Sequence, residues 1–208
     1  MSDASEYDRK AEEYNWRGPE VAFGLAYAFV RPGESALDIG IGTGLGSFLF
    51  HRAGLRVYGM DHSAEMLDAC RQKQFTADLK QHDLTVRPYP YETASMDHAI
   101  CIGVLHFFGD LRPVFGEVTR IVRDDGIFVF IVEDRAPAEE AEYVLGPEYT
   151  ETGSSVTMCR HGTEEIGELL GDHEFALVRR LEFTVPMNRE GTEAFRAKAC
   201  VARRKRRT

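Results

Sequence analysis

The sequence predicts an α/β protein whose mostly parallel sheet is covered by helices on both faces. From residue 35 to residue 133, short apolar segments alternate with helix-like segments. Parallel strands need crossover connections, and helices normally supply them. A second observation is the glycine-rich segment 40–46, which joins the first predicted strand to a helix. The third is a pair of apolar segments near the C-terminus, joined by a polar turn that predicts a hairpin.

Local signals predict the elements in order. Two helices at residues 5–15 and 19–30 open the chain, and Pro19 suits the first position of the second helix. Strands are expected at 35–39, 56–60, 77–81, 97–103 and 127–133, with helices at 45–54, 63–74 and 111–122 between them. Residues 134–162 are expected to form a loop or lid, followed by a helix at 163–171 and the hairpin strands 174–186 and 195–204.

The composition is typical of one soluble globular domain over residues 1–208. The chain is 43% hydrophobic and 28% charged, and no apolar run approaches the ~20 residues that span a bilayer. The polar, acidic N-terminus lacks the pattern of a signal peptide, so we expect a cytoplasmic protein. The four cysteines are widely scattered, which predicts reduced thiols rather than disulfides or a zinc site.

The net charge of −9 argues against a general nucleic-acid binder, because such proteins usually present a basic face. The exception is the C-terminal segment 202–207, "ARRKRR". We expect residues 203–208 to form a solvated basic tail, and the alternative is an arm that docks on RNA.

Four glycines, Gly40, Gly42, Gly44 and Gly46, occupy alternate positions just after the first predicted strand. In a parallel α/β sheet, ligands bind beyond the carboxyl ends of the strands. Glycines let backbone amides approach a ligand closely, and the N-terminus of the next helix favours negative charge. A tight turn needs only one glycine, so this segment predicts a ligand-binding loop.

Acidic residues mark three successive strand ends. Asp38 precedes the glycine loop, Asp61 ends the next strand 19 residues after Gly42, and Asp83 follows the third strand. A carboxylate at the position of Asp61 is suited to accept hydrogen bonds from both ribose hydroxyls of a nucleoside. Three acids in this place predict a nucleoside ligand with a cationic part and little or no phosphate.

A dinucleotide site is disfavoured. It would require the pattern G-x-G-x-x-G, but the third glycine position is Leu45 when counted from Gly40 and Ser47 when counted from Gly42. Asp38 would also repel a pyrophosphate, whereas it suits an ammonium or a sulfonium group.

As a set, these segments resemble the class I S-adenosylmethionine-dependent methyltransferases. "LDIGIGTGLGS", "VYGMDHSAEML" and "HDL" resemble the first three motifs of that family, and "MDHAICIGVLHFF" and "EVTRIVRDDGIFVFIVE" resemble the fourth-strand and fifth-strand regions. The chain departs from the family at "RDDG", where Lys-Pro-Gly-Gly is usual, and at Ile41, where a cysteine is common. The resemblance implies a Rossmann-like three-layer α/β/α sandwich with a seven-stranded, mostly parallel sheet whose last strand is antiparallel.

The resemblance also implies S-adenosyl-L-methionine as the cofactor, S-adenosyl-L-homocysteine as its product, and no metal. It assigns the methionine end of the cofactor to Asp38, Gly40, Gly42, Gly44 and Gly103, the ribose to Asp61 with His62 beside it, and the adenine to Asp83 and Leu84. Residues 1–30 would form a helical lid with the aromatic residues Tyr7, Tyr14 and Trp16, of which Tyr14 is expected to contact the cofactor. Packing of these rings against the helix 19–30 is the alternative.

His106, just past the fourth strand, is the candidate general base for an acceptor that loses a proton. The alternative is a loop histidine with a structural role. Arg160 and His161, at the end of the predicted loop 134–162, are further candidates for the acceptor side.

The leading functional hypothesis is a methyltransferase that acts on the oxygen or nitrogen of a small molecule by in-line displacement. The loop "GVLHFF" lacks the Asn/Asp-Pro-Pro-Tyr signature, which argues against a DNA adenine or glutamine acceptor. A protein or tRNA methyltransferase with "ARRKRR" as its docking arm, and a non-catalytic cofactor-binding regulatory module, are the alternatives. We expect a monomer or homodimer with no membrane partner.

Overall fold

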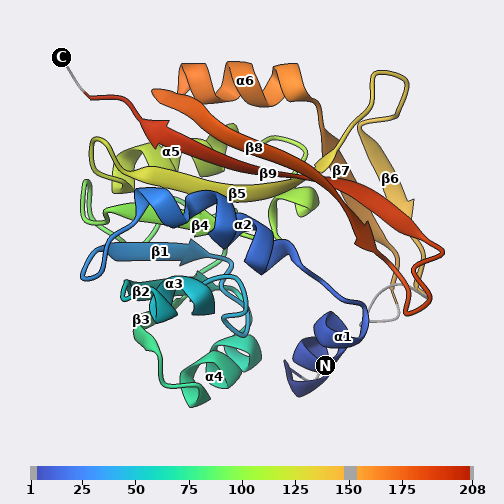
Figure 1. Cartoon of the computed structure of the whole chain (residues 1–208), viewed down its shortest axis with the longest axis horizontal. Coiled ribbons are helices and arrows are strands. Elements are labelled where there is room, and N and C mark those ends of the chain that lie inside the picture. Colours follow the sequence, from blue (N-terminus) through green and yellow to red (C-terminus); the bar gives the residue numbers. More distant parts are fainter. Residues whose placement is uncertain (1–3, 148–153, 207–208) are drawn as a thin grey trace.

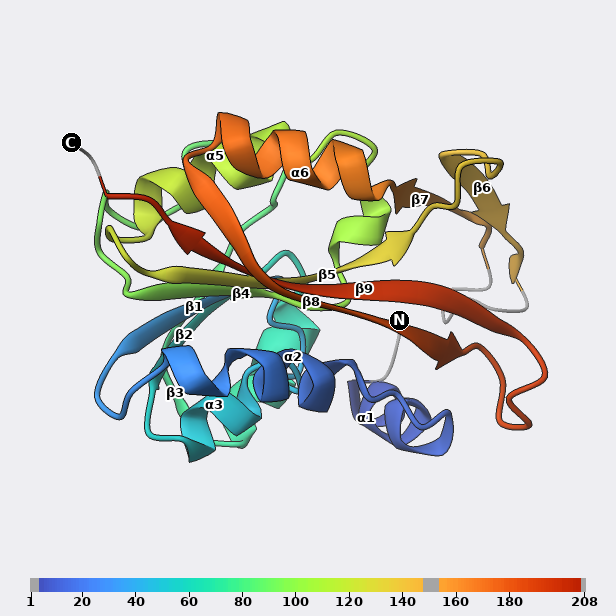
Figure 2. The same cartoon turned by 45° about the horizontal axis from the view of Figure 1, so that its top comes forward.

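A mostly parallel sheet runs through the middle of the molecule, with helices on both faces (Figures 1 and 2). The structure is a computed structural model and describes residues 4–147 and 154–206. The helices are α1 (Ala4–Glu13), α2 (Gly18–Ala26), α3 (Phe48–Arg52), α4 (Ala64–Gln72), α5 (Arg112–Ile121) and α6 (Thr163–Asp172). The strands are β1 (Ser35–Ile39), β2 (Arg56–Asp61), β3 (Thr76–Gln81), β4 (His98–Cys101), β5 (Ile127–Asp134), β6 (Glu142–Leu145), β7 (Val156–His161), β8 (Phe175–Pro186) and β9 (Ala194–Arg204).

The strand order confirms the predicted fold class. Strands β3, β2, β1, β4 and β5 pair in parallel in that order. Strand β9 then pairs antiparallel with β5, and β8 pairs antiparallel with β9. These seven strands form the predicted sheet, with the last strand of the chain as its antiparallel member. The order reverses between β1 and β4, which is where α/β sheets of this kind bind ligands.

Two further strands, β6 and β7, occupy part of the segment that was expected to be a loop or lid. They pair antiparallel with each other, and β7 pairs in parallel with only the last two residues of β5. Residues 148–153 of this segment lie outside the described residues. The prediction of a loop over 134–162 is therefore wrong for β6 and β7, which form a strand pair that extends the sheet from the end of β5.

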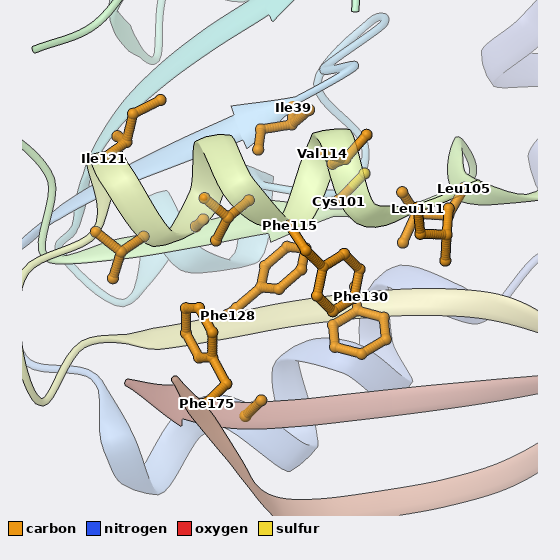
Figure 3. Close-up of a cluster of buried hydrophobic side chains, with 14 of the residues drawn as sticks. Ile39, Cys101, Leu105, Leu111, Val114, Phe115, Ile121, Phe128, Phe130 and Phe175 are labelled. Atoms are coloured by element: carbon orange, nitrogen blue, oxygen red, sulfur yellow. The ribbon is translucent and has the colours of Figure 1, made fainter. Parts of the chain in front are cut away.

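Alternate residues of β5 support two separate cores. Phe128, Phe130 and Val132 pack toward α5 and α6, where Phe115 and Phe175 join them (Figure 3). Ile127, Val129 and Ile131 belong to the core beneath α2 and α3. Because side chains alternate between the two faces of a strand, a continuous apolar run is what a centrally placed parallel strand requires.

The C-terminal segment 203–206 is not the solvated tail that was expected, because part of it is buried or paired. Arg203 and Arg204 belong to β9, and Arg204 is 1% exposed and donates to Glu174 at 3.0 Å. The exposed Arg206 donates to Asp125 at 2.6 Å, whereas residues 207–208 lie outside the described part of the chain. The first two residues of the expected tail thus belong to the sheet.

Three further observations concern membrane-spanning helices, metal-binding groups and cysteines. Over residues 4–147 and 154–206, the structure contains no helix with the length and hydropathy needed to cross a membrane. Within the same ranges, no three His, Cys, Asp or Glu side chains are grouped so that they could hold a metal ion. All four cysteines are buried free thiols.

Candidate functional site

A cavity of about 570 Å³ lies at the carboxyl ends of β1, β2 and β4. It is formed by the glycine loop, the segments that follow β2, β3 and β4, and the N-terminal residues Tyr7 and Trp16. The predicted residues that line it are Gly40, Gly42, Asp61, His62, Asp83, Leu84 and Gly103. The position matches the strand ends that the sequence analysis singled out.

The glycines of the loop differ in what surrounds them. Gly42 has a φ of +53°, and a Cβ added there would meet no atom within 4 Å, so its backbone is open toward the cavity. A Cβ on Gly40 would come within 2.4 Å of Val104, which packs the loop against the segment after β4. Gly44 has a φ of +91°, and its Cβ would come within 2.5 Å of the Phe75 ring. Gly44 does not line this cavity; its missing side chain instead makes room for the packing of Phe75.

Asp61 is the central acid of the site. It ends β2 and is 8% exposed. Its Oδ2 accepts a hydrogen bond from the Gly42 amide and its Oδ1 one from the Ser63 amide, both at 2.9 Å. Each carboxylate oxygen has a second lone pair, so the side chain keeps acceptor capacity toward the cavity. The two amides hold the carboxylate in place before any ligand arrives.

Asp38 lies beneath the glycine loop and does not line the cavity directly. It is 2% exposed, and its Oδ2 has no hydrogen-bond partner among the described residues. Burial raises the pKa of Asp38 to about 7, although the adjacent Ser47 hydroxyl favours the carboxylate, and the negative charge of Asp61 adds to the rise. A buried carboxyl with an unsatisfied oxygen is costly unless a cation or donor compensates it. The structure therefore fits a ligand with positive charge next to the loop.

The opposite end of the cavity is formed after β2 and β3. Leu84 is buried and offers an apolar surface, whereas Asp83 is exposed and accepts from the amide and hydroxyl of Thr85. These hydrogen bonds hold the pKa of Asp83 below its usual value. The His62 side chain is 81% exposed at the rim, 3.3 Å from Asp61. An apolar side chain flanked by an acceptor suits a flat heterocycle with an amino group.

Helix α1 contributes the remaining wall, and it lies past the end of β1 toward which the arrow points (Figure 1). Tyr7 and Trp16 line the cavity, whereas Tyr14 does not. The structure ends α1 at Glu13, and Asn15 has a φ of 55°, which turns the chain and returns Trp16 toward the site. Tyr14 lies outside the lining of this cavity, and its contact with the cofactor stays a prediction.

A second cavity of about 360 Å³ adjoins the first, and the two share Tyr7, Trp16, Gly103 and Phe107. His106 and Tyr14 line this second cavity and not the first. The rest of its wall comes from the end of β5, the hairpin strands β8 and β9, and α1. Two adjoining cavities at one sheet edge can hold two reacting molecules.

Glu133 is a lining residue of the second cavity that the sequence analysis did not single out. It is 1% exposed and accepts from the Tyr143 hydroxyl at 3.0 Å and from Arg160 Nε at 2.9 Å. Arg160 thus lies outside the lining of the cavity and forms an ion pair with Glu133. The only sequence signal for Glu133 was an acid at the end of a strongly apolar strand.

His161 also has a supporting position. It is 1% exposed, its Nδ1 lies 3.1 Å from Glu165, and its Nε2 lies 3.0 Å from the carbonyl oxygen of Phe108. These contacts tie β7 and α6 to the segment after β4. Neither Arg160 nor His161 lines the cavities described above.

Comparison with known proteins supports the interpretation of the first cavity as a cofactor site. The family model "Methyltransferase domain" matches residues 37–130, which include the glycine loop, Asp61 and Asp83. The malonyl-[acyl-carrier protein] O-methyltransferase of Serratia marcescens is 34% identical over 99 residues, which are 48% of this chain and 38% of that protein. The tRNA (carboxymethyluridine(34)-5-O)-methyltransferase ALKBH8 of Mus musculus is 29% identical over 139 residues, which are 64% of this chain and 20% of that protein. The chain thus spans less than half the length of either relative.

A solved structure extends the likeness to nearly the whole chain. An S-adenosylmethionine-dependent methyltransferase from Methanosarcina mazei superposes with a TM-score of 0.74 at 16% identity, covering 88% of this chain and 98% of that one. At this identity the likeness shows the fold. The family model over residues 37–130, the fold and the arrangement of the glycine loop with Asp61 thus agree, and each is similar to what S-adenosylmethionine-dependent methyltransferases have.

Proposed function

We propose that this chain transfers the methyl group of S-adenosylmethionine to a small-molecule acceptor. The observation that supports the proposal is the pair of adjoining cavities, one beside the glycine loop and Asp61, the other beside His106 and Glu133. They share Gly103 and Phe107, so molecules bound in both would meet at the end of β4.

Each cofactor group has a chemically suitable residue in the first cavity. The Asp61 carboxylate would accept hydrogen bonds from the ribose hydroxyls, and Leu84 with Asp83 would contact the adenine. The open backbone at Gly42, with Gly40 and Gly103, would face the methionine end, and the buried Asp38 would favour its positive charge. Gly44 would act only indirectly, by letting the loop pack on Phe75.

S-adenosylmethionine carries a methyl group on a sulfonium that is already activated for in-line displacement. The task of the chain is then to align an acceptor and to exclude water. Positioning of two reactants can supply about 7–11 kcal/mol of a barrier. Tyr7, Trp16 and Phe107 suit this task, because they contribute to the walls of both cavities and are large and rigid.

The structure favours a small acceptor over tRNA or a protein. Two of the C-terminal arginines that would dock an RNA already have partners within the fold, since Arg204 pairs with Glu174 and Arg206 with Asp125. The second cavity also has the size of an ordinary ligand pocket.

The proposal is tested by incubating the protein with S-adenosylmethionine and a panel of small hydroxyl, amine and carboxylate acceptors, with S-adenosylhomocysteine as the measured product. Bulk tRNA is included as a separate arm. We expect product formation with members of the small-molecule panel and none above background with tRNA. Cofactor binding without turnover of any acceptor would favour the regulatory module instead, and turnover with tRNA alone would overturn the small-molecule assignment.

Asp8 connects helix α1 to the glycine loop through its side-chain hydrogen bonds, which leads to a further prediction. Asp8 accepts from the Thr43 hydroxyl of the loop at 2.5 Å and from Lys73 Nζ at the end of α4 at 2.6 Å. The Asp8→Ala variant should bind S-adenosylhomocysteine about 3- to 10-fold more weakly, because hydrogen bonds and partly exposed ion pairs contribute about 1 kcal/mol. Stopped-flow kinetics should show faster dissociation. The exposed Glu12 on the same helix offers the control, Glu12→Ala, and equal dissociation rates in the two variants would contradict a fastening role.

A further inference from the structure

The second cavity has a predominantly apolar wall. Its carbon-rich lining residues include Tyr14, Trp16, Phe107, Ile131, Val185 and Phe195. Such a wall stabilises a ligand mainly through burial of apolar surface, and aromatic rings favour flat partners. A ring-sized molecule with an apolar body fits this environment.

The charged groups of the same wall already have partners. The buried Glu133 is paired with Arg160 and accepts from Tyr143. Lys10 lies at the rim with its Nζ 3.4 Å from Glu6 Oε1. A charged acceptor would have to lose its hydration and compete with these pairs, which is costly in a largely apolar cavity. The lining therefore favours an acceptor without net charge.

His106 is a polar side chain of this wall that is available for recognition. It is partly buried and lines the cavity, and its ring nitrogens form no hydrogen bond within residues 4–147 and 154–206. Burial, with a smaller contribution from His161, lowers the pKa of His106 to about 4. At neutral pH the ring is thus uncharged, and one nitrogen accepts a hydrogen bond while the other donates one.

We propose that the second cavity binds an uncharged, ring-containing molecule with a phenolic hydroxyl, which donates its hydrogen bond to His106. The inference rests on the proposed function and narrows its acceptor class. A phenol is favoured over an alkyl alcohol because a weakly basic imidazole assists only the departure of a comparatively acidic proton.

The proton and electron balance of the step is simple. The phenolic oxygen forms a bond to the methyl carbon while the sulfur–methyl bond breaks, and the electron pair of that bond remains on sulfur. The hydroxyl proton passes to the free ring nitrogen of His106 and then to solvent. The products are an aryl methyl ether, S-adenosylhomocysteine and a proton.

Trp16 provides a direct readout of binding, because it is the single tryptophan of the chain and lines the second cavity. Protein saturated with S-adenosylhomocysteine is titrated with 4-butylphenol, 4-hydroxybenzoate and tyramine, which differ in charge but share the phenol. We expect 4-butylphenol to change the tryptophan emission and to bind at least tenfold more tightly than the two charged probes. Equal or tighter binding of a charged probe, or no binding of 4-butylphenol, would overturn the inference.

Turnover of 4-butylphenol in the presence of S-adenosylmethionine provides the second arm. His106→Ala should lose at least tenfold in kcat, His106→Gln should recover binding of the phenol but not the rate, and both should bind S-adenosylhomocysteine normally. His51→Ala on α3, outside the lining of both cavities, is the control. Unchanged kcat in His106→Ala would contradict the role of His106. Failure of the wild-type protein to bind S-adenosylmethionine would instead refute the proposed function, so the two failures are distinguishable.

Discussion

The Asp61→Ala variant is expected to bind S-adenosylmethionine and S-adenosylhomocysteine about 10- to 100-fold more weakly than the wild-type protein. A hydrogen bond to a charged acceptor contributes about 1.5–3 kcal/mol, which corresponds to this range of dissociation constants. The substitution also deprives the Gly42 and Ser63 amides of their shared acceptor, so the loop would lose its orientation toward the ligand. Isothermal titration calorimetry measures the effect directly.

Asp68→Ala is a matched control, because it removes the same charge from an exposed position on α4. The control should bind like the wild-type protein. Thermal unfolding of both variants separates loss of the fold from loss of the site. Undiminished affinity in a folded Asp61→Ala protein would show that the ribose lies elsewhere.

The second large effect is a pH dependence that originates at Asp38. The pKa of this buried carboxyl is raised to about 7, so the group is neutral below that pH and ionised above it. A cationic ligand favours the ionised form, and its binding therefore releases a proton at low pH. The affinity for S-adenosylmethionine should rise by up to about tenfold per pH unit between roughly pH 5.5 and 7 and level off above. Calorimetry in two buffers with different ionisation enthalpies would detect the released proton.

The same shift determines how Asp38 affects the stability of the ligand-free protein. Because the folded pKa lies above the unfolded value, this group stabilises the fold when protonated, and that contribution is lost as the pH rises from about 4 to about 7. Asp38→Asn should remove both the pH dependence of binding and this loss of stability. A wild-type affinity that stays flat across the range would contradict the assigned role.

The carboxyl ends of parallel strands meet at one edge of a sheet. For this reason, much of the candidate site could be predicted from the sequence. Asp61, Asp83 and the glycine loop follow three different strands, yet they line one cavity. Their alignment follows from the sheet topology alone and needs no knowledge of long-range contacts. Their roles in binding stay predictions until a ligand is measured.

The parts that could not be predicted depend on contacts between distant segments. Gly42 and Gly44 look equivalent in the sequence, but only the folded packing of Phe75 shows that Gly44 faces away from the cavity. Likewise, Tyr7 and Tyr14 are both candidates for the lid, and only the folded chain shows that Tyr7 lines both cavities whereas Tyr14 lines the second alone. Strands β6 and β7 are short and are stabilised by pairing with each other and, for β7, with the end of β5, so local propensity did not indicate them.

The measurement that tests the account most directly is the calorimetric titration of the wild-type protein with S-adenosylmethionine, S-adenosylhomocysteine and NAD. We expect micromolar binding of the first two, about −8 kcal/mol, and no binding of NAD. Binding of NAD, or no heat with either S-adenosyl compound, would contradict the assignment of the glycine loop and of Asp61.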